Sequence, residues 1–164
     1  MSMFGSSDAQ SDFARAVKLF ETVIGGFGLD PQKCRIQTND GSTAYSLLRG
    51  SAEVLIFLNP TQQANRPNFV RMVSPLWRLP PDNHLNIFRR LLELNARDLY
   101  GTAFGLMGKD NVLDAVLVTE RPTTDMDRGE VEEMLGNIGA AGDFFDDKLV
   151  SEFGGTRLSD LHKH

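Results

Sequence analysis

Three aspartates near the end of the sequence are of a type and spacing that could do chemistry. In the segment GDFFDDKLVSEFGG, residues 142–155, Asp146 and Asp147 follow Asp143 at intervals of three and four, and Glu152 comes soon after. Side chains at these intervals are neighbours on a helix. Such carboxylates could hold a cation, or two of them could exchange protons with a substrate. This pattern leaves open a metal-dependent or acid–base enzyme that uses the acidic flank, with His84 as a further candidate.

The same residues also fit a purely structural interpretation, which we favour. A hard cation prefers six or more oxygens from a loop that wraps around it, and zinc prefers His or Cys, which this segment lacks. A catalytic carboxylate pair needs one buried member, whereas these aspartates are expected along the solvated edge of an amphipathic helix. We therefore predict no catalytic residue, no metal and no cofactor here.

The remaining reactive residue types give no second candidate. Cys34 is the single cysteine, so we expect a small, buried apolar residue in a reducing compartment. His84 opens a predicted helix, where a surface or capping role is favoured. His162 and His164 lie in a predicted tail. The segment GLMGKD lacks the hydroxyl residue that a phosphate-binding loop needs after Lys109, so we interpret it as part of a hairpin.

Composition limits the class of protein. The chain has 164 residues, 41% hydrophobic and 24% charged, with a formal net charge of -5. These values are typical of one globular domain, and the acidic balance disfavours nucleic acid as a partner. We expect a flexible tail over residues 1–10, one domain over 11–155 and a second tail over 156–164. The start has no early cationic residue and no apolar run, so we predict a cytoplasmic protein with no membrane partner.

The apolar periodicity predicts an order of helix, strands, helix, two strands, helix. The first helix should follow Ser11 and end in GGFG at 25–28, the second should follow Asp82, and the third should start at Thr124 or Asp125 and end at Gly154. Strands are expected in AYSLLRG, AEVLIFLN, FVRMVSP, TAFGLM and NVLDAVLVTE, the last two joined as a hairpin through GKDN. Consecutive strands favour an α+β fold with an antiparallel β-sheet flanked by three helices.

Two of these strands carry apolar residues on both faces. In AEVLIFLN, Val54, Ile56 and Leu58 alternate with Leu55 and Phe57, and NVLDAVLVTE shows the same pattern. Three helices hardly suffice to cover both faces of a five-stranded sheet. We therefore expect part of one face to await a second copy or a segment of another protein.

Four residues are candidates for such a protein interface. Phe144 should point away from the apolar side of the last helix, and Ile87 and Leu94 should project from the side of the second helix opposite its main apolar stripe. Trp77 could plug the sheet edge or anchor a partner. Asn95 falls within the stripe of Leu85, Phe88, Leu91, Leu92 and Leu99. It is expected to bond backbone groups of a neighbouring loop or strand, or to lie at a dimer seam.

The segments GSAEVLIFLNP, VSPLWRLP, FRRLLELNA, VLVTERPTT and GDFFDDKLVSEFGG, in this order, resemble the bacterial YbjN family. The resemblance extends from about Tyr45 to Gly155. It implies a type III secretion chaperone-like fold, in which helices flank a curved antiparallel sheet. In the secretion chaperones, two protomers form a dimer around which a non-globular client segment wraps. The family brings no enzymatic motif.

These observations together predict a non-enzymatic, chaperone-like cytoplasmic protein. We expect a homodimer that holds a client protein segment on an apolar surface through side-chain burial. Two alternatives stay open: the enzyme that uses the acidic flank, and a structural subunit of a larger assembly, for example in carboxysome assembly.

Overall fold

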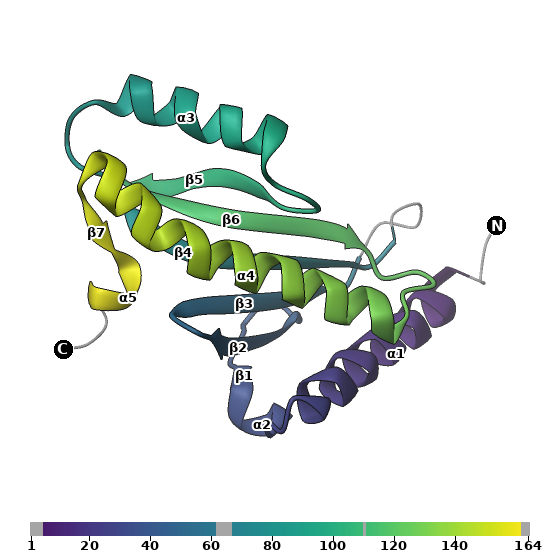
Figure 1. Ribbon diagram of the computed structural model, residues 1–164. Helices are drawn as coiled ribbons and strands as arrows, with labels where there is room; N and C mark the ends of the chain where they lie inside the picture. Colours follow the sequence, from purple (N-terminus) through teal and green to yellow (C-terminus); the bar gives the residue numbers. More distant parts are fainter. Residues whose placement is uncertain (1–4, 62–66, 110, 162–164) are drawn as a thin grey trace. The chain divides into compact units, whose positions relative to one another are not determined.

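The computed structural model describes residues 5–61, 67–109 and 111–161. These residues form five helices and seven strands, shown in Figure 1. The helices are α1 (Gly5–Gly26), α2 (Pro31–Cys34), α3 (His84–Arg97), α4 (Arg128–Phe153) and α5 (Leu158–Leu161). The strands are β1 (Arg35–Ile36), β2 (Thr43–Arg49), β3 (Ala52–Asn59), β4 (Phe69–Arg78), β5 (Ala103–Lys109), β6 (Val112–Pro122) and β7 (Thr156–Arg157).

The strands join in one sheet with the hydrogen-bonded order β1-β2-β3-β4-β6-β5, and β7 adds to β4. β5 and β6 form an antiparallel hairpin in which Phe104 lies opposite Leu117. The predicted α+β class with an antiparallel sheet is confirmed. The described part of the chain contains no helix that is both long and apolar enough to cross a bilayer.

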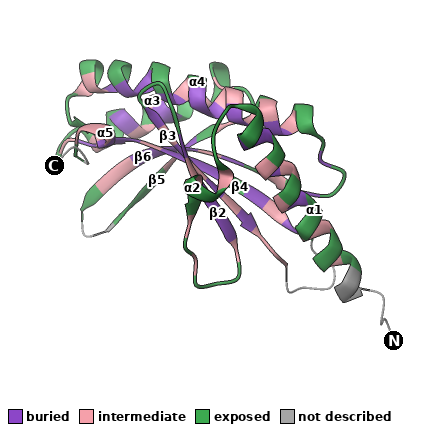
Figure 2. Cartoon of the chain, turned by 90° about the horizontal axis from the view of Figure 1, so that it is seen from below, coloured by how far each residue is buried: buried purple, intermediate pink, exposed green. Residues whose placement is uncertain are grey.

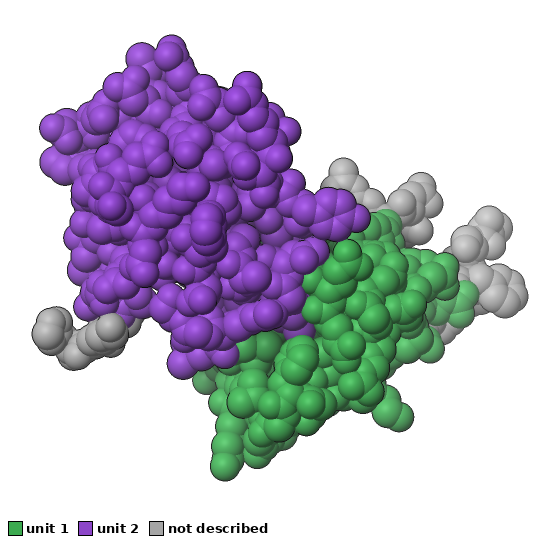
Figure 3. Space-filling view, viewed as in Figure 1, with its two compact units in different colours: residues 1–47, 55–72, 120–134 green, residues 48–54, 73–119, 135–164 purple. Residues whose placement is uncertain are grey.

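The structure divides into two compact units, distinguished by colour in Figure 3. Unit 1 comprises residues 1–47, 55–72 and 120–134, and unit 2 comprises residues 48–54, 73–119 and 135–164. The largest buried side chains of unit 1 include Phe20, Ile24, Tyr45 and Leu58. Those of unit 2 include Trp77, Ile87, Leu94, Leu117 and Leu149. That 11–155 forms a single domain stays a prediction.

Helix ends agree with the sequence signals at the carboxyl side and less well at the amino side. α1 ends at Gly26, and α4 ends where Gly154, with a φ of 77°, donates its N–H to Val150. The predicted start of α4 at Thr124 or Asp125 is wrong. Asp127 and Glu130 instead exchange hydrogen bonds, the Asp127 N–H to Glu130 Oε2 at 3.0 Å and the Glu130 N–H to Asp127 Oδ1 at 2.9 Å. This reciprocal pair caps the helix from Arg128 onward.

Both predicted tails contain ordered elements. α1 already begins at Gly5, ahead of the expected start after Ser11. Thr156 and Arg157 form β7 opposite Arg78 and Trp77 of β4, and Leu158 is 7% exposed. Residues 5–10 therefore belong to a helix, and pairing with β4 and the burial of Leu158 hold residues 156–158. The bounds expected for the two tails stay a prediction. Residues 1–4 and 162–164, including His162 and His164, lie outside the described residues.

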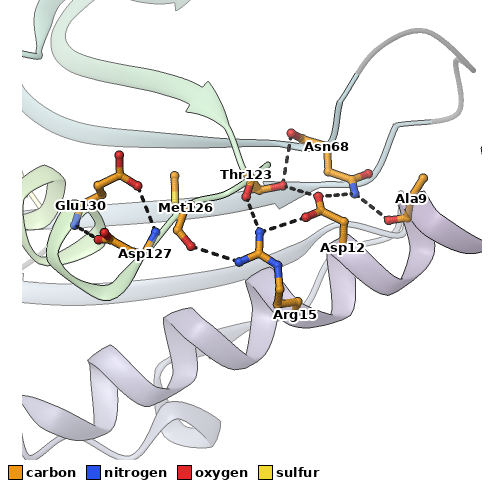
Figure 4. A network of polar contacts seen from close by, with 8 residues as sticks. All are labelled: Ala9, Asp12, Arg15, Asn68, Thr123, Met126, Asp127 and Glu130. Atoms are coloured by element: carbon orange, nitrogen blue, oxygen red, sulfur yellow. Dashed lines mark hydrogen bonds and ion pairs between the residues drawn. The ribbon is translucent and has the colours of Figure 1, made fainter.

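A polar network holds α1 in unit 1, as Figure 4 shows. Asp12 accepts hydrogen bonds from Arg15 at 3.0 Å, from Asn68 at 3.2 Å and from the Thr123 hydroxyl at 3.0 Å. Arg15 donates to the Thr123 carbonyl at 2.8 Å and to the Met126 carbonyl at 3.1 Å. Burial alone would raise the pKa of Asp12, but the hydrogen bonds from Arg15, Asn68 and Thr123 outweigh it and hold the pKa below its usual value. The ionised form of Asp12 is therefore favoured by folding.

Asp12→Asn should lower stability at neutral pH by about 1 kcal/mol and reduce its dependence on acid pH. The native pKa of Asp12 is depressed, so its contribution is complete above the unfolded pKa and is lost as pH falls through the native pKa. The difference between wild type and variant should shrink as pH is lowered from 7 toward 2, in urea unfolding at several pH values. Asp125→Asn, at an exposed position whose φ of 58° suits asparagine, is the control. A constant difference at all pH values would contradict this account of Asp12.

Candidate functional site

Helix α3 in unit 2 carries apolar residues on two opposite sides. Ile87, Leu91 and Leu94 are buried, at 0%, 4% and 1% exposed. Leu85 and Leu92 are exposed at 75% and 67%. At about 100° per residue, Leu85 and Leu92 lie within about 20° of one another and nearly opposite Ile87 and Leu94. The helix therefore presents one apolar side to the core and another to solvent.

The sequence pattern led us to predict the wrong apolar side of α3 as the side that faces the core. Ile87 and Leu94 were expected on the open side of the helix, and Leu85 and Leu92 on the core side. The exposed fractions show the reverse: Ile87 and Leu94 face the core, and Leu85 and Leu92 face solvent. Both sides satisfy the helical period, so periodicity alone cannot choose between them. Ile87 and Leu94 offer no surface for a partner in this structure.

The hydrogen bonds of Asn95 determine which apolar side of α3 faces the core. Its Nδ2 donates to the Phe104 carbonyl at 3.2 Å, and its Oδ1 accepts the Phe104 N–H at 2.6 Å. Phe104 lies on β5, the edge strand beside α3 (Figure 1). The expectation that Asn95 bonds backbone groups of a neighbouring strand is confirmed. The amide takes the place of a strand partner at this point of the edge.

A shallow hollow of about 440 Å³ follows the exposed side of α3. We call it the α3 hollow; it is lined by Leu85, Phe88, Arg89, Leu92, Glu93, Ala96 and Arg97. Apolar residues form its floor, while Arg89, Glu93 and Arg97 place charges of both signs along it. Figure 2, coloured by burial, shows the alternation of buried and exposed positions along α3.

A second hollow of about 400 Å³ lies in unit 2 between the segment after α3 and the middle of α4. We call it the Phe144 hollow; it is lined by Asp98, Leu99, Tyr100, Thr102, Asn137, Ala140, Ala141, Phe144, Phe145 and Lys148. Phe144 is 60% exposed and Tyr100 is 77% exposed. The Lys148 ammonium lies 5.0 Å from the centre of the Phe144 ring. The structure thus places Phe144 on the surface, and its role in an interface stays a prediction.

Trp77 is fully buried and offers no surface to a partner. Its Nε1–H donates to the Gly154 carbonyl at 2.7 Å, and its ring stacks on Phe153 with centroids 6.1 Å apart. β7 pairs with the Trp77 backbone. Of the two predicted roles for Trp77, the structure agrees with the one inside the domain, where the end of α4 and the segment after it cover the ring.

The acidic flank of α4 is engaged with unit 2, and the prediction that all of it is solvated is wrong. Asp146 is only 3% exposed. Its Oδ2 lies 2.8 Å from the Ser51 hydroxyl, and its Oδ1 accepts the Asp147 N–H at 2.6 Å. Asp143 Oδ1 accepts the Ser51 N–H at 3.0 Å and lies 2.9 Å from the Ser51 hydroxyl. Both carboxylates therefore hold the turn between β2 and β3 against α4.

Close approach at this turn requires glycines. A Cβ on Gly50, whose φ is 59°, would lie 2.5 Å from Asp143 Oδ1. On α4, a Cβ on Gly142 would lie 2.9 Å from the Ala52 Cβ and 3.0 Å from the Ser74 Oγ. Hydrogen bonds from Ser51 hold the pKa of Asp143 below its usual value, with the larger effect from the Ser51 N–H and the smaller from its hydroxyl. These contacts account for the acidic pattern without any bound ion.

The other residues considered for chemistry also have structural roles. Asp147 forms an ion pair with Arg157. His84 Nε2 lies 2.8 Å from the Pro80 carbonyl, and its ring stacks on Phe88 with centroids 5.8 Å apart. Cys34 is half-buried. Within residues 5–61, 67–109 and 111–161, no group of three or more His, Cys, Asp or Glu side chains could hold a metal ion.

The fold is shared with a solved structure. The chain superposes on a chain of the crystal structure of the ExsC-ExsE complex with a TM-score of 0.57, over 82% of this chain and 92% of that one, at 18% sequence identity. This similarity confirms the predicted type III secretion chaperone-like fold.

Relatives by sequence cover less of the chain. Uncharacterized proteins of Mycobacterium tuberculosis and Mycobacterium bovis are 38% identical over 69 residues, which is 42% of this chain and 36% of each relative. The match thus spans about a third of the length of these curated relatives. No family model matches the chain.

Ser51→Ala should lower the free energy of unfolding by about 1–3 kcal/mol, because it removes the hydroxyl that faces the buried Asp146 carboxylate. The check is the midpoint of urea unfolding at neutral pH. Ser151→Ala, at an exposed position on α4, is the matched control and should be neutral or slightly stabilising. Equal midpoints for Ser51→Ala and wild type would show that the turn does not depend on this contact.

Proposed function

We propose that this protein is a non-enzymatic, chaperone-like protein that holds a segment of another protein on an apolar surface. The observation that carries the proposal is the exposure of large apolar side chains at the two hollows of unit 2: Leu85 and Leu92 on α3, and Tyr100 and Phe144 at the Phe144 hollow. Exposed apolar residues that gather at a hollow mark interaction sites more often than scattered ones do. The solved structure with the same fold is itself that of a complex, ExsC with ExsE.

The contacts of the polar residues support a role without chemistry. Asp143 and Asp146 are engaged by Ser51, Asp147 by Arg157, and His84 by the Pro80 carbonyl. Catalytic acids and bases must instead reach a substrate. The proposal includes residence in the cytoplasm and needs no cofactor. It also includes membership of the YbjN family, which the order of the segments from Tyr45 to Gly155 supports.

We further propose that the α3 hollow is covered by a second copy of the chain. Two α3 helices packed antiparallel about a twofold axis would bury Leu85 and Leu92 of both copies. With the axis near Leu91, Arg89 of each copy lies opposite Glu93 of the other. Opposite charges then face one another twice, so the face is complementary to itself. A client segment would use the remaining exposed apolar surface, including the Phe144 hollow.

Binding of an unfolded protein is the direct test of the function. The full chain should raise the fluorescence anisotropy of a labelled model protein that is reduced and alkylated so that it cannot refold, and should leave the same protein in its native, disulfide-bonded form unchanged. Phe144→Ser should weaken this binding by about tenfold because it removes an exposed aromatic anchor. Leu48→Ser, at a residue 77% exposed outside both hollows, should bind as wild type does. Equal binding of native and unfolded forms, or none, would refute the proposal.

The homodimer has its own test. Light scattering of wild type should give twice the 18.2 kDa mass of one chain, and the double variant Leu85→Asp with Leu92→Asp should give 18.2 kDa. Four carboxylates would then meet at the proposed interface with no compensation. Leu48→Asp makes the same chemical change at another exposed leucine and should remain dimeric. Circular dichroism verifies that each variant is folded, and a monomeric wild type would refute the dimer.

A further inference from the structure

Three aromatic rings in contact run from the core of unit 2 to its surface, and the last of them lines the Phe144 hollow. Phe104 and Phe145 are 8% and 4% exposed and meet edge to face, with centroids 5.3 Å apart at 80°. Phe145 and Phe144 meet in the same way, with centroids 4.9 Å apart at 86°. Phe144 is the last ring and is 60% exposed. Edge-to-face pairs of this kind stabilise beyond the burial of their area, so a further apolar or aromatic side chain would find a preformed contact.

The shape of the hollow suits one large side chain. The small side chains of Ala140 and Ala141 on α4 leave space beside Phe144, and Leu99 and Tyr100 line the hollow from the segment after α3. Its volume of about 400 Å³ is at the lower end of the range for ligand-binding pockets. It is therefore large enough for a side chain with its own backbone, and too small for a folded domain.

Lys148 places a positive charge on the α4 wall of the hollow, beside Phe144, while Asp98 lines the hollow from the segment after α3. Its ammonium lies 5.0 Å and 5.7 Å from the centres of the Phe144 and Phe145 rings. No ion pair of Lys148 is present within the described ranges of the chain. The two rings hold the cation at the rim of the hollow, where a carboxylate of a partner could reach it. A partner with a cation at this position would be repelled.

Thr102 supplies a polar group that lacks a partner. Its Oγ1 is buried and has no hydrogen-bond partner among the residues that the structure describes. Thr102 also lines the hollow. A buried hydroxyl without a partner is costly. This observation is independent of the aromatic rings and of Lys148.

We propose that the Phe144 hollow binds a short segment of another protein in which a large apolar side chain, best an aromatic one, is followed or preceded closely by an acidic residue. The apolar side chain packs on Phe144 and Tyr100, and the carboxylate pairs with Lys148. The inference rests on the proposed protein-binding function and specifies the chemistry of the client segment. The hollow selects acidic clients in spite of the net charge of -5 on the chain, because the attraction of Lys148 acts at short range while more distant charges are screened by salt.

A charge-reversal experiment tests this specificity with defined probes. Two fluorescein-labelled nine-residue peptides share a central Phe in a Gly/Ser context and differ only in flanking residues, Asp in one and Lys in the other. The wild-type full chain should bind the Asp peptide about fivefold more tightly than the Lys peptide at low salt, by anisotropy titration. Lys148→Glu should reverse this preference. Phe144→Ala should weaken both peptides, and Leu48→Ala should weaken neither.

The outcomes separate this inference from the function on which it rests. Equal affinity for the two peptides, an unchanged preference in Lys148→Glu, or no binding of either peptide to wild type would overturn the inference. If the unfolded model protein still binds in those cases, the general protein-binding function stands. If neither the peptides nor the unfolded protein binds, both proposals fall. A preference that disappears together with the dimer, in Leu85→Asp with Leu92→Asp, would overturn the assignment to this hollow in favour of the α3 hollow.

Discussion

The pairing of Asn95 with Phe104 is the contact on which the exposed surfaces of unit 2 depend. An edge strand leaves every second pair of backbone N–H and C=O groups without a partner strand. The Asn95 side-chain amide offers both a donor, Nδ2, and an acceptor, Oδ1, which meet the carbonyl and the N–H of Phe104 at 3.2 Å and 2.6 Å. This contact fixes the rotation of α3 about its own axis. Once that rotation is set, Ile87 and Leu94 must face the core, and Leu85 and Leu92 must face outward.

The turn between β2 and β3 and the two hollows of unit 2 differ in how their side chains are satisfied. At the turn between β2 and β3, polar groups are matched by hydrogen bonds: Ser51 bonds both the exposed Asp143 and the buried Asp146, and glycines allow the close approach. At the hollows, apolar groups are left open, and Phe144 and Tyr100 are 60% and 77% exposed. Polar matching holds this turn in place, whereas an open apolar surface gains free energy only when something covers it. This contrast is why binding, and not chemistry, is the function that we propose.

Sequence patterns predicted the elements well and their contacts less well. Glycines at 25–28 and at 154 ended helices as expected, and the alternation in AEVLIFLN marked β3. The rotation of α3 could not be predicted, because its two apolar sides satisfy the same period and the deciding partner, Phe104, comes from another element. The burial of Asp146 was missed for a similar reason: its donor, Ser51, is distant in sequence. Tyr100 and Lys148 gave no signal, since a lone aromatic or lysine gains meaning only from its neighbours in space.

The environment of the Trp77 indole depends on the end of α4. Trp77 is the only tryptophan in the sequence, and its indole N–H is bonded to the Gly154 carbonyl at the point where α4 ends. The ring is enclosed by Phe153 and by the segment that continues into β7. Any loosening of the last turn of α4 would therefore hydrate the indole and shift its emission toward the red. The molecule carries an intrinsic optical probe at the junction of β4, α4 and β7, which reports on that junction without a label.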